Sequence, residues 1–400
     1  MIHLADKQKC TGCSACANSC PSKCITMVRD EDGFSFPRVD SSVCVNCGVC
    51  SRICPVLHTK EKQKQNTVAY AAYTKNDDLR MASSSGGIFS EISMEILNQG
   101  GVVYGATYDE NFHVLHKCVE SSQELATLRG AKYAQSDIGI CLSDIQERLE
   151  SGQIVLFSGT PCQVTGLKAF LKKDYDLLYC IDFVCHGVPS PMVWEEYVQY
   201  RADLDCHGLF PRFIDLRCKE SGWSRYSYSV DFTYENGVRY LRKNGEDEFM
   251  QMFVKDYVLR ESCGYCKEKG YDRESDITLG DFWGIWDINP EMDDNKGTSM
   301  ILTHSEKGEY LLRKIKDRVQ MKQVELKQAS QMNTSMLKSS EHKRERKEIL
   351  DAISNSGFQS LNILLPEHMN LKEAIANKAR GLIKKVFNIG KNTLVKENQS

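Results

Sequence analysis

The chain has 400 residues and a mass of 45.4 kDa, which at roughly 150 residues per domain predicts two to three domains. Its 41% hydrophobic and 26% charged residues are typical of a globular protein, and no apolar run reaches the roughly 18 to 20 residues of a membrane-spanning helix. The net charge of -3 argues against nucleic acid as the main partner.

Cysteine is the unusual component of this sequence. The N-terminal stretch MIHLADKQKC lacks the basic and apolar regions of a secretory signal, so we expect a cytoplasmic protein. Because the cytosol keeps thiols reduced, the 18 cysteines predict metal binding or redox chemistry rather than disulfides.

Two cysteine repeats dominate the N-terminal region, and each runs Cys-x2-Cys-x2-Cys-x3-Cys-Pro. In such a repeat three thiolates hold one cubane, while the fourth, before the proline, reaches the other cubane. Zinc sites usually pair two CxxC motifs around one spacer, and this pattern does not match them. The repeats therefore predict a two-[4Fe–4S] ferredoxin-type domain over residues 1–60. The first cluster is assigned to Cys10, Cys13, Cys16 and Cys54, and the second to Cys44, Cys47, Cys50 and Cys20.

Two other features accompany these repeats. The segment between them alternates around Asp32-Gly33, which predicts a hairpin of two short strands. Cys24 has no required place in the cluster pattern, and we interpret it as a small buried residue. A polar, charged stretch then predicts a linker near residues 58–67.

Residues 67–150 begin with VAYAAYTK, which predicts a strand, and continue into a Ser/Gly-rich turn before the helical pattern IFSEISMEILN. A turn of this kind can seat a phosphate at a helix N-terminus, although it is more often an ordinary helix cap. Further on, Arg129 and Lys132 could neutralise a pyrophosphate and Tyr133 could stack on a flat ring. A solvated loop explains the same three residues equally well.

Residues 151–330 repeat the order strand, turn, helix. IVLFSG leads to Cys162 and DLLYCIDFV leads to Cys185, so two thiols follow equivalent strand ends, where α/β folds place ligands. Cys263 and Cys266 form a CxxC pair. These four thiols could hold a third cubane, while the CxxC pair alone could be a redox pair or half a zinc site. His186 is a candidate proton donor or a structural hydrogen-bonding residue.

Short motifs with a fixed order run through this part of the chain: Ser85-Gly86-Gly87, Gly159-Thr160-Pro161-Cys162-Gln163, Cys185-His186-Gly187, Cys263-Gly264-Tyr265-Cys266 and SDITLGDFWG at 275–284. Over residues 67–320 they resemble the coenzyme F420 hydrogenase/dehydrogenase beta-subunit family. The resemblance implies an α+β protein: a small two-cluster ferredoxin domain, then an α/β flavin-binding core with a mixed sheet. This core would comprise residues 67–150 and 151–330, followed by a helical tail over 331–400.

The family also implies an activity, that of an iron–sulfur flavoprotein oxidoreductase with FAD. In this interpretation the inner cubane is held by Cys162, Cys185, Cys263 and Cys266. The resemblance assigns no catalytic residue. The residues that it suggests for holding the flavin are Ser85, Gly86, Gly87, Lys132, Gly159, Thr160 and Gln163.

Electrons would pass between the N-terminal clusters, the inner cluster, FAD and a substrate, because clusters carry single electrons and flavin couples them to hydride transfer. The redox partner expected is ferredoxin, coenzyme F420 or NAD(P)H, or else a small organic substrate. Alternatives are a ferredoxin-dependent reductase of an organic substrate in polysaccharide metabolism and a non-catalytic electron-carrier subunit. The chain could act as a homo-oligomer or as a subunit of a complex.

The last residues carry a basic amphipathic helical pattern. It could touch a membrane surface or a partner, and a solvated terminal helix is the simpler interpretation. Its basic residues are Lys372, Lys378, Arg380, Lys384 and Lys385.

Overall fold

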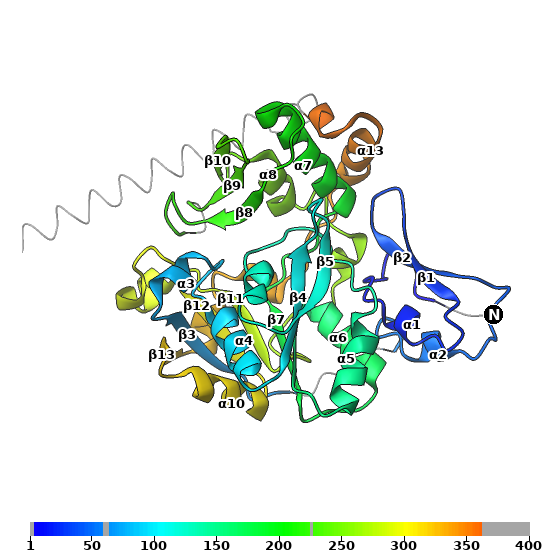
Figure 1. Cartoon of the computed structure of the whole chain (residues 1–400), viewed down its shortest axis with the longest axis horizontal. Helices are drawn as coiled ribbons and strands as arrows, with labels where there is room; N and C mark the ends of the chain where they lie inside the picture. Colours follow the sequence, from blue (N-terminus) through cyan, green and yellow to red (C-terminus); the bar gives the residue numbers. More distant parts are fainter. Residues whose placement is uncertain (1–3, 59–63, 225–226, 362–400) are drawn as a thin grey trace, which may run out of the picture.

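The computed structural model of the protein describes residues 4–58, 64–224 and 227–361. Within these ranges the chain forms a small N-terminal unit, a central eight-stranded sheet and a separate three-stranded sheet (Figure 1). The predicted basic helix after residue 361 lies outside the described residues. The α+β fold with a mixed sheet, expected from the sequence, is confirmed.

The N-terminal unit contains two one-turn helices, α1 (Ala15–Asn18) and α2 (Val49–Arg52), and an antiparallel hairpin of β1 (Ile25–Arg29) and β2 (Ser35–Val39). The hairpin predicted around Asp32-Gly33 is confirmed, and Gly33 turns the chain with a φ of 83° that favours glycine. This unit lies beside α5 (Cys141–Glu150) and α6 (Pro161–Leu171) of the central domain (Figure 1).

The central sheet has the strand order β13-β3-β12-β11-β7-β6-β4-β5. Its middle strands β11, β7, β6 and β4 run parallel, and the strands at both sides pair antiparallel. The strands are β3 (Val68–Thr74), β4 (Val102–Tyr108), β5 (Val114–Val119), β6 (Val155–Ser158), β7 (Leu178–Phe183), β11 (Ile277–Asp281), β12 (Ser299–Thr303) and β13 (Val319–Val324).

Helices cover both faces of this sheet, as parallel strands require. Along β4, Val102 and Tyr104 pack toward α5 (Cys141–Glu150) and α6 (Pro161–Leu171), whereas Val103 packs toward α4 (Ile88–Asn98) and α10 (Glu306–Ile315). The alternation follows from the two-residue period of a strand. The helix predicted from IFSEISMEILN coincides with α4.

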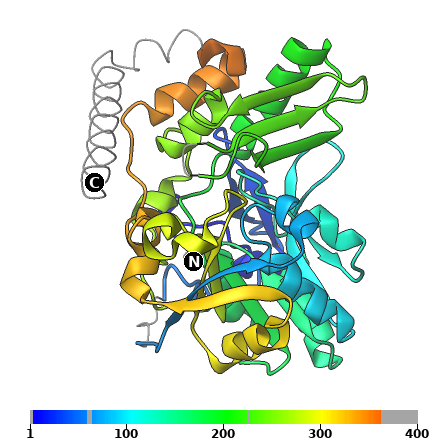
Figure 2. The same cartoon turned by 90° about the vertical axis from the view of Figure 1, so that its left-hand side faces the viewer.

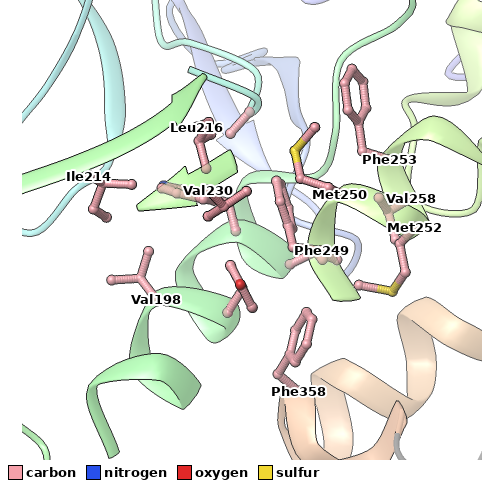
Figure 3. Close-up of a cluster of buried hydrophobic side chains, with 14 of the residues drawn as sticks. Val198, Ile214, Leu216, Val230, Phe249, Met250, Met252, Phe253, Val258 and Phe358 are labelled. Atoms are coloured by element: carbon pink, nitrogen blue, oxygen red, sulfur yellow. The ribbon is translucent and has the colours of Figure 1, made fainter. Parts of the chain in front are cut away.

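The small sheet has the order β10-β9-β8, from β8 (Phe213–Cys218), β9 (Ser229–Thr233) and β10 (Arg239–Lys243). It packs on α7 (Pro191–Cys206), α8 (Glu248–Val254) and α13 (Arg346–Ser356). Figure 3 shows the apolar core between them, where Leu216 and Val230 of the sheet meet Phe249 and Phe358.

Several strands of the central sheet end at the same edge. Because β3 and β11 both run antiparallel to β12, they are parallel to each other, and the carboxyl ends of β3, β11, β7, β6 and β4 share one side. The small sheet lies over this side in both views (Figures 1 and 2). In open α/β sheets this is the side on which ligands bind.

Short helices make the remaining connections: α3 (Asp77–Met81), η1 (Glu124–Leu128), η2 (Glu261–Tyr265), α9 (Ile285–Ile288), η3 (Pro290–Met292), α11 (Leu326–Ser330), α12 (Thr334–Leu337) and η4 (Phe358–Ser360). Among the described residues, no helix is both long enough and apolar enough to cross a membrane.

Candidate functional site

The four thiols predicted for the first cluster lie close enough to influence one another. Burial raises the pKa of Cys13 to about 11, and the thiols of Cys10 and Cys54 act in the same direction. Burial likewise raises the pKa of Cys16, with Cys13, Cys10 and Cys54 adding to the effect. Cys54, from the far end of the second repeat, therefore meets the first repeat in space, as the spacing predicts.

The four thiols predicted for the second cluster line a single cavity. Cys20, Cys44, Cys47 and Cys50 all contribute to its wall. Cys24 lines the same cavity, and its Sγ lies 3.3 Å from that of Cys20. Cys24 is buried, as expected, but its place beside the second set of thiols could not be read from the spacing.

The two repeats adopt the same backbone shape. Gly12 and the equivalent Asn46 have φ values of 69° and 54°, and Ser14 and the equivalent Gly48 have φ values of 60° and 68°. Left-handed backbone is costly for residues other than glycine, so its repetition at matching positions shows that both loops are held in the same shape. The shape presents three thiols of each repeat from one tight loop.

A third group of thiols gathers at the carboxyl side of the central sheet. Cys162 is the second residue of α6, which follows β6, and Cys185 follows the neighbouring parallel strand β7. Cys263 lies in η2 and Cys266 directly after it. Burial raises the pKa of Cys162 well above its usual value, and Cys185, Cys266 and Cys263 raise it further. Burial also raises the pKa of Cys185 to about 12, with Cys263 and Cys266 contributing.

The donor set of all three groups consists of thiols, which suits iron–sulfur clusters. Each iron of a cubane needs only one thiolate, so the four thiols need not converge on a point. Within residues 4–58, 64–224 and 227–361, no three His, Cys, Asp or Glu side chains converge closely enough to hold a single metal ion.

The turn that carries Cys162 is fixed by a capping box. Gln163 Oε1 accepts a hydrogen bond from the Thr160 N–H at 2.9 Å, and its Nε2 donates to Ser136 Oγ at 2.9 Å. The Thr160 hydroxyl lies 3.2 Å from Cys162 Sγ. A side chain at Gly159 would come within 3.0 Å of Gln163 Oε1. These three residues, suggested by the family resemblance for flavin binding, therefore hold the start of α6 in place.

The Ser85-Gly86-Gly87 turn is packed against the end of β3. An added Cβ at Gly86 would clash with the Ala72 carbonyl oxygen, and the Gly86 N–H donates to Ser299 Oγ at 2.9 Å. Ser85 Oγ donates to the Thr298 carbonyl at 3.2 Å. No side chain caps α4, which begins after Gly87 at a φ of 84°, so the backbone rather than a capping side chain shapes this turn.

Lys132 lies under the small sheet. Its ammonium donates to the Arg129 carbonyl at 2.6 Å and sits 5.7 Å from the ring centre of Tyr108, which ends β4. Burial lowers the pKa of Lys132 to about 7. The neighbouring Tyr133 hydroxyl accepts a hydrogen bond from Arg217 at 3.1 Å. Lys132 and Tyr133 are half-buried and contact Tyr108 and Arg217, so their side chains are not fully solvated.

The sequence did not reveal Arg217 and Lys219 of the small sheet as site residues. Arg217 donates to Asp281 Oδ2 at 2.6 Å and stacks on Trp223, with 4.5 Å from Cζ to the ring centre. Its Nε is buried without a hydrogen-bond partner. Lys219 donates to the Ser85 carbonyl at 2.6 Å, and burial, followed by repulsion from Arg80, lowers its pKa to about 7.

These contacts connect the residues suggested for the flavin across the carboxyl side of the sheet. Lys219, which directly follows β8, meets Ser85, and Arg217 of β8 meets Tyr133. Tyr108 Oη and Arg129 Nε are also buried there without a hydrogen-bond partner. Buried donors without partners are uncommon, and here they leave capacity for an anionic, hydrogen-bonding ligand. The residues present fit a flavin nucleotide.

His186 has structural partners. Its Nε2 lies 2.6 Å from Asp256 Oδ1, and its Nδ1 lies 3.0 Å from Ser335 Oγ. Burial acts to raise the pKa of Asp256, but hydrogen bonds from His186 and from the Glu341 N–H outweigh it and lower the pKa. This arrangement fits the structural role for His186 better than a free proton donor.

Comparison with known families agrees with the thiol arrangement. Residues 9–57 match the 4Fe-4S dicluster domain, which makes the chain an iron–sulfur protein. Residues 152–330 match the family described as the C terminus of the beta subunit of coenzyme F420 hydrogenase/dehydrogenase. The resemblance drawn from the sequence motifs is confirmed.

Other comparisons add little detail. A solved structure of the F420-reducing [NiFe] hydrogenase complex from Methanosarcina barkeri, derivatised with xenon, contains a chain of 13% sequence identity. The match covers 74% of this chain and 97% of that chain with a TM-score of 0.48. No curated protein matches the sequence.

Proposed function

We propose that the chain is an iron–sulfur flavoprotein oxidoreductase that passes electrons between three [4Fe–4S] clusters, FAD and a hydride-transferring or organic substrate. The observation that carries the proposal is the close approach of two thiol sets. The first N-terminal set packs against α6, and Cys162 of the inner set lies near the start of the same helix. A Cβ at Gly166 would lie 2.6 Å from the Cys13 Cβ, so the first N-terminal loop packs on α6, the helix whose second residue is Cys162. Four residues along a helix rise about 6 Å, so the two thiol groups are neighbours.

Three sets of thiols would hold the clusters. The outermost set surrounds the cavity near α2, the middle set packs on α6, and the innermost set lies at the carboxyl side of the sheet. The sets in this order are Cys44, Cys47, Cys50 and Cys20; Cys10, Cys13, Cys16 and Cys54; and Cys162, Cys185, Cys263 and Cys266.

The outer set offers the point of electron entry or exit. Cys47 is exposed, and nearby in the same loop Val43 and Val45, on either side of Cys44, are 50% and 67% exposed. An apolar rim around an exposed thiol suits brief contact with a small electron-carrier protein. We infer that ferredoxin docks here, while a soluble hydride carrier such as coenzyme F420 or NAD(P)H reacts at the flavin.

The flavin would lie between the central sheet and the small sheet. Ser85, Gly86, Gly87 and Gly159 bring backbone close to this region, where Lys132 supplies a half-buried amine. Arg217 is paired with Asp281, and its Nε keeps a buried hydrogen-bond donor without a partner. Buried positive charge favours electron-rich states of a ligand, because it is weakly screened there. The stacked rings of Trp223 and Trp283 would shield this side from water.

A bound cluster exchanges single electrons and a bound flavin couples two of them to one hydride, so the two cofactors together connect a one-electron carrier with a hydride carrier. The residues of this chain would hold the groups in order, keep water away and supply positive charge. We propose that these roles are divided among the domains. Residues 1–60 would transfer electrons, residues 67–150 and 151–330 would form the flavin core, and residues 331–400 would be a C-terminal extension.

The test is reduction of the anaerobically purified full chain, followed by flavin absorbance and by the electron paramagnetic resonance of the clusters. NADH, NADPH, reduced coenzyme F420 and reduced ferredoxin are each added in turn. We expect at least one of them to bleach the flavin and reduce the clusters together. A chain without bound flavin that exchanges electrons only with ferredoxin would instead be an electron-carrier subunit, and the proposal would be wrong.

A further inference from the structure

The backbone of Arg260 is hydrogen-bonded to Cys263 of the innermost thiol set. Its carbonyl accepts a hydrogen bond from the Cys263 N–H at 2.9 Å, and its own N–H donates to the Val188 carbonyl at 2.9 Å. The Val188 N–H in turn points to Cys263 Sγ at 3.4 Å. The residue therefore helps to shape the turn that presents Cys263.

The side chain of Arg260 contacts the N-terminal unit. The Nε donates to the Cys10 carbonyl at 2.8 Å, one terminal nitrogen to Gln135 Oε1 at 2.6 Å and the other to the Ser35 carbonyl at 3.1 Å. A Cβ at Gly12 would lie 3.1 Å from the guanidinium, so the loop leaves room for it. Arg260 is 2% exposed and bridges two units of the chain.

The charge of this guanidinium lies between two thiol sets. All three of its hydrogen-bond acceptors are neutral oxygens, and they do not cancel the charge. Burial lowers the pKa of Arg260, whereas the thiols of Cys10, Cys263 and Cys162, followed by Asp30, act to raise it. Arginine nevertheless stays protonated in proteins, so this is a fixed positive charge.

We propose that Arg260 is a positioning residue for electron transfer, which holds the middle and inner clusters at a fixed separation and makes both easier to reduce. This inference rests on the proposed function. In the step concerned, one electron leaves the reduced middle cluster, which is oxidised, and enters the oxidised inner cluster, which is reduced, and no atom moves. A buried positive charge beside both clusters stabilises the added electron on either one.

The chain offers a matched control in Arg346. It crosses to the same N-terminal hairpin, with Cζ 5.8 Å from the ring centre of Phe34, against 5.4 Å for Arg260. It donates to the Leu259 carbonyl at 2.7 Å and to Asp32 Oδ2 at 3.1 Å. Arg346 therefore also contacts the N-terminal unit, but the carboxylate of Asp32 partly neutralises its charge.

The experiment is a redox titration of the anaerobically purified full chain, monitored by electron paramagnetic resonance, with iron content measured in parallel. It compares wild type with Arg260→Gln, Arg260→Lys and Arg346→Gln, and the inner cluster is recognised as the signal that Cys162→Ser removes. For Arg260→Gln we expect the reduction equilibrium of the middle and inner clusters to fall about tenfold, about 59 mV for one electron, with the outer cluster unchanged. Arg260→Lys and Arg346→Gln should keep wild-type potentials.

Unchanged potentials in Arg260→Gln, or an equal shift of all the clusters, would overturn the inference. If Arg260→Gln loses its iron, its potentials cannot be compared with wild type, and the rate of electron transfer in Arg260→Lys is the test. Lysine keeps the charge but not the fork of hydrogen bonds, so we expect at least tenfold slower transfer from the middle to the inner cluster. A wild-type rate would contradict a positioning role. If wild type itself has no inner cluster, the proposed function fails, and this outcome is distinct from the others.

Discussion

In the proposed function the N-terminal thiols and the inner thiols would serve the same chemistry, but the fold brings them together in different ways. The N-terminal sets come from two short repeats whose loops share matching φ values at Gly12 and Asn46 and at Ser14 and Gly48. The inner set comes from the ends of two parallel strands and from a distant one-turn helix. Local spacing determines the first kind of site, whereas the second depends on the topology of the whole sheet.

This difference has a consequence for robustness. Each N-terminal loop is short, so its thiols stay together as long as the loop is intact. The inner thiols meet only while β6, β7 and η2 keep their places, and Arg260 and Gly166 are the points where the two kinds of site meet. Substitutions at the inner set and at this junction should therefore differ in their effects from substitutions in the repeats.

The largest expected effect is that of Cys162→Ser. It removes one thiolate of the inner set, so we expect about four fewer iron atoms per chain and loss of electron transfer from the N-terminal clusters to flavin. Flavin content should be largely kept, since no N-terminal or flavin residue is changed. The matched control is Cys180→Ala, because Cys180 is buried in β7 outside the set. Unchanged transfer in Cys162→Ser would remove the inner relay from the account.

A second pair of variants separates ligand from neighbour in the outer set. Cys20→Ser should cost one cluster, or about four iron atoms, because the fourth thiol of a repeat serves the other cubane. Cys24→Ser should leave iron content unchanged, although the two sulfur atoms are 3.3 Å apart. Iron and sulfide analysis of both variants measures how many clusters each one retains. A whole cluster lost in Cys24→Ser but kept in Cys20→Ser would mean that Cys24, not Cys20, is the ligand.

Gly166→Ala tests the junction itself. The new methyl group would lie 2.6 Å from the Cys13 Cβ, so the N-terminal loop must shift. Overpacking of this kind costs about 1 to 3 kcal/mol of folding free energy. Denaturant unfolding of the cluster-loaded chain should show this loss, together with slower transfer between the middle and inner clusters. Gly245→Ala is the control, because nothing lies within 4 Å of its added Cβ. Equal stability of the two variants would show that the contact is loose.

The smallest expected effect concerns pH and Lys132. Its pKa of about 7 is low because of burial, and an anionic pyrophosphate nearby would raise it, so FAD binding should take up a proton above pH 7. Affinity for FAD should then fall as pH rises above 7, by at most about tenfold per pH unit. Lys132→Met should flatten this dependence, whereas Lys117→Met, at an exposed position of β5, should not. Calorimetry in buffers of different ionisation heat measures the proton uptake directly.

Much of the fold could be predicted because local signals were strong. The Asp32-Gly33 turn, the helical period that became α4 and the apolar strand before Cys162 all coincide with observed elements. The thiols of the repeats could be grouped from spacing alone. Grouping the inner thiols required the parallel pairing of β6 with β7, which only a strand–turn–helix pattern hinted at.

The rest of the site could not be predicted, for a physical reason. Arg217, Lys219 and Arg260 are charged side chains in segments without a clear apolar period, and such residues usually lie in solvent. Here they are at most 7% exposed, since neutral carbonyls, aromatic rings and a carboxylate from distant parts of the chain surround them. A single sequence gives no sign of such long-range partners.

The cofactor content of the chain tests the central claim most directly. Iron, sulfide and flavin should be counted on anaerobically purified protein, with absorbance recorded before and after dithionite. Three occupied thiol sets and the flavin region predict about 12 iron atoms, as much sulfide and one FAD per chain. About eight iron atoms and no flavin would contradict the claim and leave a two-cluster ferredoxin fused to a binding domain.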